Sequence, residues 1–425
     1  MSSAKANRKQ KERILKAVTC PHCWHHFDVS EIVWVAKHDD LRGDLILGGD
    51  AHIRFLPTRF NVDGDALDSR SMACQDLACP RCHLTIPRIF LKFEPLIFSL
   101  IGVPYSGKSY FLAAMTWELA RILPTQYLMV LQNVDYSGNQ TLVDFQEKLF
   151  FQGDSDQPVA IPKTQLDSAT HYDSTNLDGQ NVLLPRPFLF GITPMENHPN
   201  FSQADAISRV LCVYDNAGEH FLTGHDTSLT PGTQHVAKAK VLMFLYDPIQ
   251  DPRIRQKCQT VSNDPQLSTY GRTQLQSPIL TEAVSRVRQY SHLPSNKKLD
   301  QPLIVLIPKA DIWESLINED LTTEPCHVPK PPSREFAVVD TARIERVSAK
   351  IRRLLLEITP EFVATAEDCC REVVYIPVSS LGCSPTPQEA TNSLVVKPRD
   401  IKPRWVTVPV LYAFSKWATG LLASQ

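Results

Sequence analysis

One stretch of fourteen residues, Leu96–Ser109, constrains the fold of this chain more than any other. A run of apolar and β-favouring residues ends at Gly102, and residues 102–109 read GVPYSGKS, which fits the pattern GxxxxGK followed by Ser or Thr. Residues 110–123 (YFLAAMTWELARIL) then have the composition of an amphipathic helix with an apolar stripe. The sequence therefore predicts a strand, a glycine-bounded loop and a helix, the context in which this motif binds phosphate.

Each residue type in this loop suits a phosphate ligand. Backbone N–H groups between Gly102 and Gly107 would surround the phosphates at the positive end of the helix. Lys108 would reach the β- and γ-phosphates and is a candidate catalytic residue, and the Ser109 hydroxyl would bind Mg²⁺. The other loop positions assigned to nucleotide binding are Pro104, Ser106 and Tyr110. The alternative is a chance match in a helix-capping turn, which the flanking strand and helix disfavour.

Composition limits the classes of protein to which the chain can belong. Its 425 residues suffice for one large domain or two to three smaller ones. The formal net charge of −2 gives no global field that would attract nucleic acid or an anionic membrane. No apolar stretch approaches the roughly 20 residues of a membrane-spanning helix. Residues 1–17 form a basic tail without the apolar core of a secretory signal, so the 11 cysteines indicate reduced thiols, metal binding and a cytoplasmic protein.

Two CxxC pairs, Cys20-Pro-His-Cys23 and Cys79-Pro-Arg-Cys82, lie in a region that we assign to residues 18–90. Each pair can turn its two thiolates toward one ion, and two pairs complete a tetrahedral zinc site. Their separation far exceeds the usual ~15–20 residues, so we predict an insertion with strands at residues 31–37 and 53–57. The alternative is four buried, reduced cysteines without a metal. Substitute ligands that a complete set of four cysteines does not need are Cys74, His22, His25, His26 and His83.

We predict that residues 91–425 form one α/β domain, with a mostly parallel sheet flanked by helices. Beyond the strand before the phosphate loop, strands are expected at residues 127–131, 187–193, 210–214, 241–246, 303–307 and 373–378. Helices are expected at residues 280–290, 341–357 and 410–422. Three polar stretches, residues 135–186, 247–278 and 319–337, are interpreted as surface loops or partly ordered flaps.

A second motif, Asp215-Asn-Ala-Gly218, directly follows one of these apolar runs. A carboxylate at the end of a hydrophobic strand can hold Mg²⁺ directly or through water. The Gly218 N–H could meet a γ-phosphate, so that its loop senses hydrolysis. Glu219 and His220 are candidate catalytic residues that could orient water, although a carboxylate beside a γ-phosphate is unfavourable unless screened. The alternative is an ordinary strand-to-loop turn.

Two later strands also end in motifs. Lys309 and Asp311 belong to a sequence close to NKxD, in which the carboxylate accepts two hydrogen bonds from a guanine edge that adenine does not offer. The lysine stem can cover the base face. Pro308 stands where that motif has Asn, so this side-chain amide is missing, and the alternative is a loop that happens to begin Lys-Ala-Asp. Ser379 and Ser380 end the last strand in the style of an SAK or SAL base-contacting loop.

This ordered series of motifs resembles the Ras-like (TRAFAC) P-loop GTPases over residues 93–425. With the preceding zinc knuckles, the YSGKSYFLAAM sequence and the DNAGE motif, it is similar to the bacterial double-GTPase family, proposed to act in multi-gene conflict or signalling systems. The resemblance implies a P-loop NTPase fold preceded by a small β-rich zinc ribbon. The residue roles it implies are Lys108 and Ser109 on phosphate and Mg²⁺, Asp215 on the metal side, Gly218 as γ-phosphate sensor, and Lys309 and Asp311 on guanine.

The chain departs from the Ras-like pattern at two positions. Pro104 stands where Ras-like members often have Gly, and its ring would crowd an incoming arginine finger. Glu219 stands where many small GTPases have a water-positioning Gln. We therefore expect slow hydrolysis and a switch rather than a metabolic enzyme. The threonine that would contact Mg²⁺ in the first switch region is not fixed by the sequence, and its candidates are Thr164, Thr170, Thr175 and Thr193.

The leading hypothesis is a cytoplasmic switch that binds GTP and GDP with Mg²⁺, carries a structural Zn²⁺ and signals to protein partners. The first alternative is a P-loop ATPase, which the missing Asn at Pro308 favours. The second is a zinc-ribbon adaptor for nucleic acid or protein, in which nucleotide is a structural ligand. Only the zinc module and the basic tail favour nucleic-acid binding.

Overall fold

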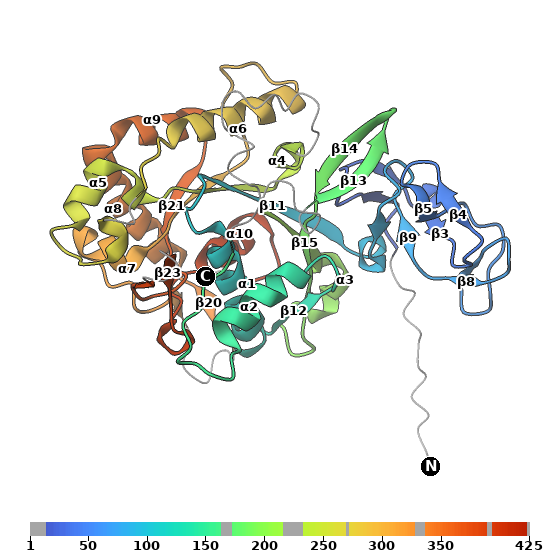
Figure 1. Cartoon of the computed structure of the whole chain (residues 1–425), viewed down its shortest axis with the longest axis horizontal. Coiled ribbons are helices and arrows are strands. Elements are labelled where there is room, and N and C mark those ends of the chain that lie inside the picture. Colours follow the sequence, from blue (N-terminus) through green and yellow to red (C-terminus); the bar gives the residue numbers. More distant parts are fainter. Residues whose placement is uncertain are drawn as a thin grey trace, which may run out of the picture.

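A seven-stranded sheet lies at the centre of the computed structural model, which describes residues 14–162, 172–215, 233–268, 272–327, 336–388 and 393–422 (Figure 1). Its strand order is β12-β15-β16-β11-β17-β18-β21. The strands are β11 (Glu94–Gly102), β12 (Met129–Asn133), β15 (Phe188–Pro194), β16 (Arg209–Asp215), β17 (Val241–Leu245), β18 (Leu303–Ile307) and β21 (Val373–Pro377). The five strands from β16 to β21 are parallel, whereas β15 is antiparallel to both β16 and β12.

Helices cover both faces of this sheet, so its central strands are apolar throughout. Every residue of β17 (VLMFL) and β18 (LIVLI) is buried, as expected for strands covered on two sides. In Figure 1, α1 and α10 lie on one face, and α4 and α6 lie on the other. The helices are α1 (Lys108–Gln126), α2 (Gln140–Phe150), α3 (Ala204–Ile207), α4 (His235–Lys238), α5 (Pro252–Cys258), α6 (Ser277–Tyr290), α7 (Ala310–Trp313), α8 (Thr341–Ile358), α9 (Pro360–Cys369) and α10 (Val408–Trp417).

The N-terminal part is a small module of short strands at one end of the molecule (Figure 1). A four-stranded sheet has the order β10-β9-β3-β6, and three hairpins pair β1 with β2, β4 with β5 and β7 with β8. The strands are β1 (Ala17–Thr19), β2 (His26–Asp28), β3 (Val33–Val35), β4 (Arg42–Asp44), β5 (Gly48–His52), β6 (Arg54–Phe55), β7 (Ala66–Leu67), β8 (Ala73–Cys74), β9 (Leu77–Ala78) and β10 (Thr85–Ile86).

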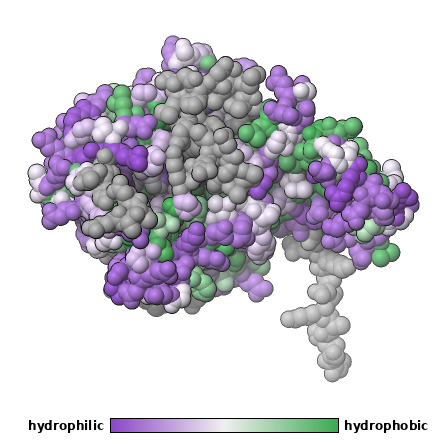
Figure 2. All heavy atoms as spheres, viewed as in Figure 1, coloured by the Kyte–Doolittle hydropathy of each residue, from purple (hydrophilic) through white to green (hydrophobic). Residues whose placement is uncertain are grey.

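The surface is mostly hydrophilic on the face shown in Figure 2, and hydrophobic residues gather over the N-terminal module. Leu45 and Val62 of this module are 97% and 102% exposed. Among the described residues, none of the helices has both the length and the apolar character that crossing a membrane requires.

All seven expected strands of the central sheet are present within a few residues of their predicted bounds, and so are the four expected helices, except that α10 ends at Trp417 rather than at residue 422. The interpretation of the polar stretches as loops is wrong in part. Residues 135–186 contain α2 and the hairpin of β13 (Tyr172–Leu177) with β14 (Gln180–Pro185). The buried side chains of α2 are Leu142, Phe145 and Leu149, a stripe that packs on α1 although the rest of the helix is polar. Tertiary burial here outweighs the polar composition of the segment.

The other two polar stretches also hold regular structure. Residues 247–278 contain α5, which begins at a proline after an Asp251 cap. Residues 319–337 contain β19 (Cys326–His327), which pairs with β20 (Val338–Val339). A further hairpin joins β22 (Thr386–Gln388) to β23 (Ser393–Val395). The short strands are held by pairing with one another, which a polar and proline-rich sequence does not reveal.

Candidate functional site

The strand, loop and helix around Gly102 form as the sequence predicts. A Cβ atom at Gly102 would lie 2.9 Å from both the side chain and the carbonyl of Leu245, so glycine lets β11 and β17 approach here. Gly107, with φ of +92°, turns the chain into α1, which begins at Lys108. Glycine is suited to this left-handed conformation because it has no Cβ atom. The loop is thereby set at the carboxyl edge of the sheet and the N-terminus of α1.

Lys108 is buried, and its ammonium bonds to the loop itself. Its Nζ donates to the carbonyls of Gly102 and Val103, both at 2.9 Å. The Ser106 hydroxyl also donates to the Val103 carbonyl, at 2.7 Å. A cation therefore lies within the loop that would receive phosphate.

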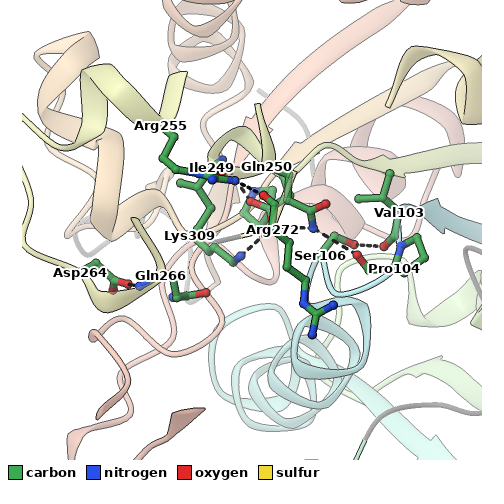
Figure 3. A network of polar contacts seen from close by, with 12 residues as sticks. Val103, Pro104, Ser106, Ile249, Gln250, Arg255, Asp264, Gln266, Arg272 and Lys309 are labelled. Atoms are coloured by element: carbon green, nitrogen blue, oxygen red, sulfur yellow. Dashed lines mark hydrogen bonds and ion pairs between the residues drawn. The ribbon is translucent and has the colours of Figure 1, made fainter. Parts of the chain in front are cut away.

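A partly buried chain of polar contacts joins the phosphate loop to the KxD segment, and sequence reasoning missed it. The Gln250 amide donates to the Pro104 carbonyl at 3.1 Å and to the Asp247 carboxylate at 3.2 Å (Figure 3). Asp247 has no solvent exposure, and the Lys309 ammonium lies 2.7 Å from its carboxylate. Asp247 follows β17 by two positions, so its place just beyond the carboxyl end of a parallel strand is the only signal that could have identified it.

The KxD segment and the last strand's loop are bonded to each other. The Ser379 hydroxyl donates to the Asp311 carboxylate and accepts from the Gly382 N–H at 2.9 Å. Lys309 has a left-handed conformation, with φ of 58°, and caps α7. The Pro308 carbonyl accepts from the Trp313 indole at 2.8 Å. One oxygen of Asp311 is thus held by Ser379, which fixes the orientation of its carboxyl group.

One cavity of about 250 Å³ is lined by three of the sequence motifs. The phosphate loop, the KxD segment and the last strand's loop supply the following residues: Tyr105, Ser106, Gly107, Pro308, Lys309, Asp311, Ser379 and Ser380. Tyr110 also lines it, and its hydroxyl accepts from the Ile161 N–H at 3.0 Å. Burial raises the pKa of the Tyr110 phenol and raises that of the Cys383 thiol to about 11, so both lining groups are neutral near pH 7.

The apolar part of the cavity comes from segments that no motif marked. Leu394 and Val395 of β23 line it together with Val396, which follows this strand, and Leu381. Gln266, from the 247–278 stretch, adds a side-chain amide. A planar apolar group could therefore lie between these side chains while its polar edge faced Asp311.

Ser109 and Asp215 both lie at the carboxyl edge of the central sheet. Asp215 is the last residue of β16 and pairs in register with Leu100 of β11, whose strand leads into the phosphate loop. Ser109 is the second residue of α1, directly after that loop. A hydroxyl and a carboxylate supply oxygen ligands of the kind that Mg²⁺ binds. Gly218, Glu219 and His220 lie outside the described residues.

Two of the four threonines that the sequence offers as Mg²⁺ contacts of the first switch region lie elsewhere in the structure. Thr175 is buried in β13, and its hydroxyl donates to the Cys82 carbonyl at 2.8 Å. Thr193 follows Ile192, which pairs with Arg209 at the opposite end of β16 from Asp215. Thr193 is therefore too far along the strand to share a metal ion with Asp215, and its candidacy is wrong. Thr164 and Thr170 lie outside the described residues.

The four cysteines of the two CxxC pairs converge on one point in the N-terminal module. All four are buried, and their sulfur atoms lie within 4.8 Å of one another. The Cys20–Cys82 and Cys23–Cys79 sulfur distances are 3.7 and 3.6 Å. Ligands about 2.3 Å from a tetrahedral zinc ion would lie about 3.8 Å apart, so the cluster fits Zn²⁺.

The two knuckles have matching backbone geometry. The N–H groups of His22 and Arg81 donate to the sulfur atoms of Cys20 and Cys79, at 3.3 and 3.4 Å. The residues that follow the second cysteines, Trp24 and His83, have φ values of 56° and 60°. Burial raises the pKa of the Cys20 thiol, so a bound cation is what would favour its thiolate form.

The substitute ligands considered from sequence lie elsewhere. The sulfur of Cys74 lies 3.9 Å from a carboxylate oxygen of Asp68. His22 contacts the Thr85 carbonyl at 3.0 Å, and His83 contacts Asp44 at 2.8 Å. None of these three side chains belongs to the four-cysteine cluster.

Comparisons with known proteins give no close relative. A scan against protein-family models finds no match, and no curated protein matches the sequence significantly. Among solved structures, the chain is similar to translation elongation factor SelB from Methanococcus maripaludis with the GTP analogue GppNHp, at 9% identity over 68% of this chain and 30% of that chain, with a TM-score of 0.22. It is also similar to Era in complex with MgGDPNP and nucleotides of 16S ribosomal RNA, at 11% identity over 71% and 62% of the two chains, with a TM-score of 0.22.

A third similar structure is the signal recognition particle receptor SRb-GTP/SRX complex from Chaetomium thermophilum, at 12% identity over 70% and 96% of the two chains, with a TM-score of 0.24. The chain spans less than two thirds of the SelB and Era chains. At these TM-scores the similarity carries no functional argument.

Proposed function

We propose that this protein binds GTP with Mg²⁺ in the cavity between the phosphate loop and the KxD segment, and that it acts as a slowly hydrolysing switch. The convergence of motifs from distant parts of the chain on one cavity carries this proposal. The fixed orientation of Asp311 adds to it, because one carboxylate oxygen bonds to Ser379 and the group can still accept from a guanine edge.

The phosphates would lie against the loop amides at the N-terminus of α1. Lys108 would exchange the carbonyls of Gly102 and Val103 for phosphate oxygens. Ser109 and Asp215 would hold Mg²⁺, which neutralises charge on the β- and γ-phosphates when bound. At the other end, Asp311 would accept from the guanine N1–H and N2–H₂ groups.

Slow hydrolysis is expected from the phosphate loop. Pro104 places a rigid ring within it, and its carbonyl is held by Gln250, so the loop resists rearrangement around an external arginine. Gly218 would sense the γ-phosphate, and Glu219 and His220 are the proposed water-orienting residues. Similarity to the bacterial double-GTPase family supports a cytoplasmic signalling role toward a protein partner, with Cys20, Cys23, Cys79 and Cys82 holding a structural zinc ion.

Calorimetric titration with GTP and ATP tests the proposal. Asp311→Ala removes two hydrogen bonds to a charged acceptor, so we expect GTP affinity to fall about 100-fold with little change for ATP. Asp205→Ala, in the exposed first turn of α3, is the matched control and should bind GTP like wild type. Wild type that binds ATP more tightly than GTP, with no effect of Asp311→Ala, would instead support the ATPase alternative.

A further inference from the structure

We propose that Tyr214 couples the four-cysteine site to the nucleotide site, so that zinc loading and Mg²⁺–nucleotide binding increase each other's affinity. This inference rests on the proposed function, because it needs a nucleotide at the phosphate loop. It assigns a positioning role to a residue of β16 that touches neither ligand, and it makes the zinc knuckles part of the switch.

The Tyr214 side chain is fully buried. Its hydroxyl accepts one hydrogen bond from the first zinc knuckle and donates another to it. The Trp24 indole N–H donates to the Tyr214 hydroxyl at 3.0 Å. That hydroxyl in turn donates to the carbonyl of Pro21. Pro21 follows Cys20 and Trp24 follows Cys23, so a single phenol bridges both ends of one knuckle.

Three aromatic rings pack around this bond. The His235 ring of α4 stacks on Tyr214 with a centroid distance of 4.4 Å and lies 5.6 Å from the Trp24 ring. Trp24 is 4% exposed, and His235 and Tyr214 have no exposed surface. A movement of the knuckle relative to β16 would break both hydrogen bonds and open a gap in this packing.

Tyr214 immediately precedes Asp215, the proposed Mg²⁺ ligand. In β16 the two residues pair with Ser99 and Leu100 of β11, the strand that leads to the phosphate loop. Holding the phenol of Tyr214 in place therefore also holds the position of the Asp215 backbone relative to the phosphate loop. A metal ligand must be held within about 0.5 Å of its productive position, so the coupling needs only a small displacement.

The second knuckle holds the neighbouring part of the sheet. The Thr175 hydroxyl of β13 donates to the Cys82 carbonyl, and Arg81 forms an ion pair with Asp178 at 3.4 Å. Figure 1 shows the β13–β14 hairpin beside the N-terminal module. This hairpin leads directly into β15, which pairs with β16. The two knuckles thus brace the β15–β16 side of the central sheet at separate points.

Thermodynamic linkage makes the effect of zinc on nucleotide affinity equal to the effect of nucleotide on zinc affinity. If zinc favours the arrangement of β16 that binds Mg²⁺–nucleotide, nucleotide must raise zinc affinity by the same factor. Coupling between such sites is typically about 5- to 150-fold. A zinc ion that only holds the module together would show no such dependence on nucleotide in a folded protein.

Equilibrium competition with a chelator of known zinc affinity, with and without saturating Mg²⁺–GppNHp, measures this factor on the zinc-loaded full chain. We expect nucleotide to tighten zinc binding at least about 5-fold in wild type. Tyr214→Phe keeps the ring but removes the hydroxyl, so zinc and nucleotide should still bind while the factor falls toward one. Trp24→Phe removes the indole N–H donor together with part of the ring that packs on Tyr214 and His235. It should lower the factor part of the way, which covers the case that Tyr214→Phe does not fold.

Tyr412→Phe is the matched control, because this buried tyrosine bonds to Glu345 at 3.2 Å, away from the knuckles. It should keep the wild-type factor. A wild-type chain that binds nucleotide with unchanged zinc affinity overturns the inference alone, as does full coupling in Tyr214→Phe. A zinc-loaded chain that binds no nucleotide overturns the proposed function and the inference with it.

Discussion

The ammonium of Lys309 lies 2.7 Å from the carboxylate of Asp247, a side chain with no solvent exposure. The same carboxylate accepts from Gln250, whose amide also bonds to the Pro104 carbonyl. A single charge pair with a buried carboxylate therefore connects the segment that would contact the base with the loop that would contact the phosphates. The two halves of the cavity are aligned before any ligand binds, which lowers the ordering cost of binding.

Removing the Asp247 charge should weaken both the fold and the site. Asp247→Ala leaves the Lys309 ammonium without its counter-charge, and we expect a loss of about 2–3 kcal/mol in the free energy of unfolding. Nucleotide affinity should fall as well, because Gln250 loses one of its two acceptors. Chemical denaturation checks the first effect. Asp300→Ala removes a carboxylate from an exposed pair with Arg371 and should change stability by less than about 1 kcal/mol.

Gly102→Ala should separate the strands that position the phosphate loop. The new Cβ atom would lie 2.9 Å from Leu245 backbone and side-chain atoms, so β11 or β17 must shift. We expect about 1–3 kcal/mol of destabilisation and a loss of nucleotide binding. At Gly153 an added Cβ meets nothing within 4 Å, so Gly153→Ala is the matched control. Equal thermal stability of the two variants would contradict the close approach at Gly102.

The four-cysteine cluster should hold one zinc ion per chain. Cys20→Ser or Cys79→Ser removes a ligand, so elemental analysis should show loss of zinc, and circular dichroism should show unfolding of residues 18–90. Cys74→Ser changes a buried cysteine outside the cluster and should retain zinc. Less than one zinc per wild-type chain, or normal folding of Cys20→Ser, would point to reduced thiols without a metal.

Asp215 should matter for Mg²⁺ rather than for the base. In Asp215→Asn the carboxylate charge is lost, so the dependence of GTP affinity on Mg²⁺ concentration should weaken while the preference for guanine persists. Titrations with and without Mg²⁺ measure both properties. A wild-type Mg²⁺ dependence in Asp215→Asn would exclude this residue from the metal site.

The parts of the site that follow strands directly could be predicted from the sequence. Lys108, Asp311 and Ser379 each belong to a short motif at the carboxyl end of a parallel strand, and a parallel sheet brings such ends to one edge. The cysteine cluster was likewise predictable from the spacing within each pair.

The connections between these motifs could not be predicted. Gln250 lies in a polar stretch without a pattern, and its acceptor Pro104 is 146 residues away in sequence. Tyr214 reads as one more apolar residue of a buried strand, because nothing in the sequence indicates that its hydroxyl meets a knuckle 190 residues earlier. The helix at residues 140–150 lies within the stretch 135–186, whose polar composition favours a loop, because its three buried side chains become an apolar stripe only against α1.

The central claim is that Asp311 belongs to a guanine site. An exchange of base specificity tests this claim most directly. Asn at position 311 can accept from Ser379 through its carbonyl oxygen and offer its N–H₂ group to the base, which suits the C2 carbonyl of xanthine rather than the amino group of guanine. We predict that wild type binds GTP more tightly than xanthosine triphosphate and that Asp311→Asn reverses this order by calorimetry. An Asp311→Asn variant that keeps the wild-type preference for GTP would contradict a guanine site at Asp311.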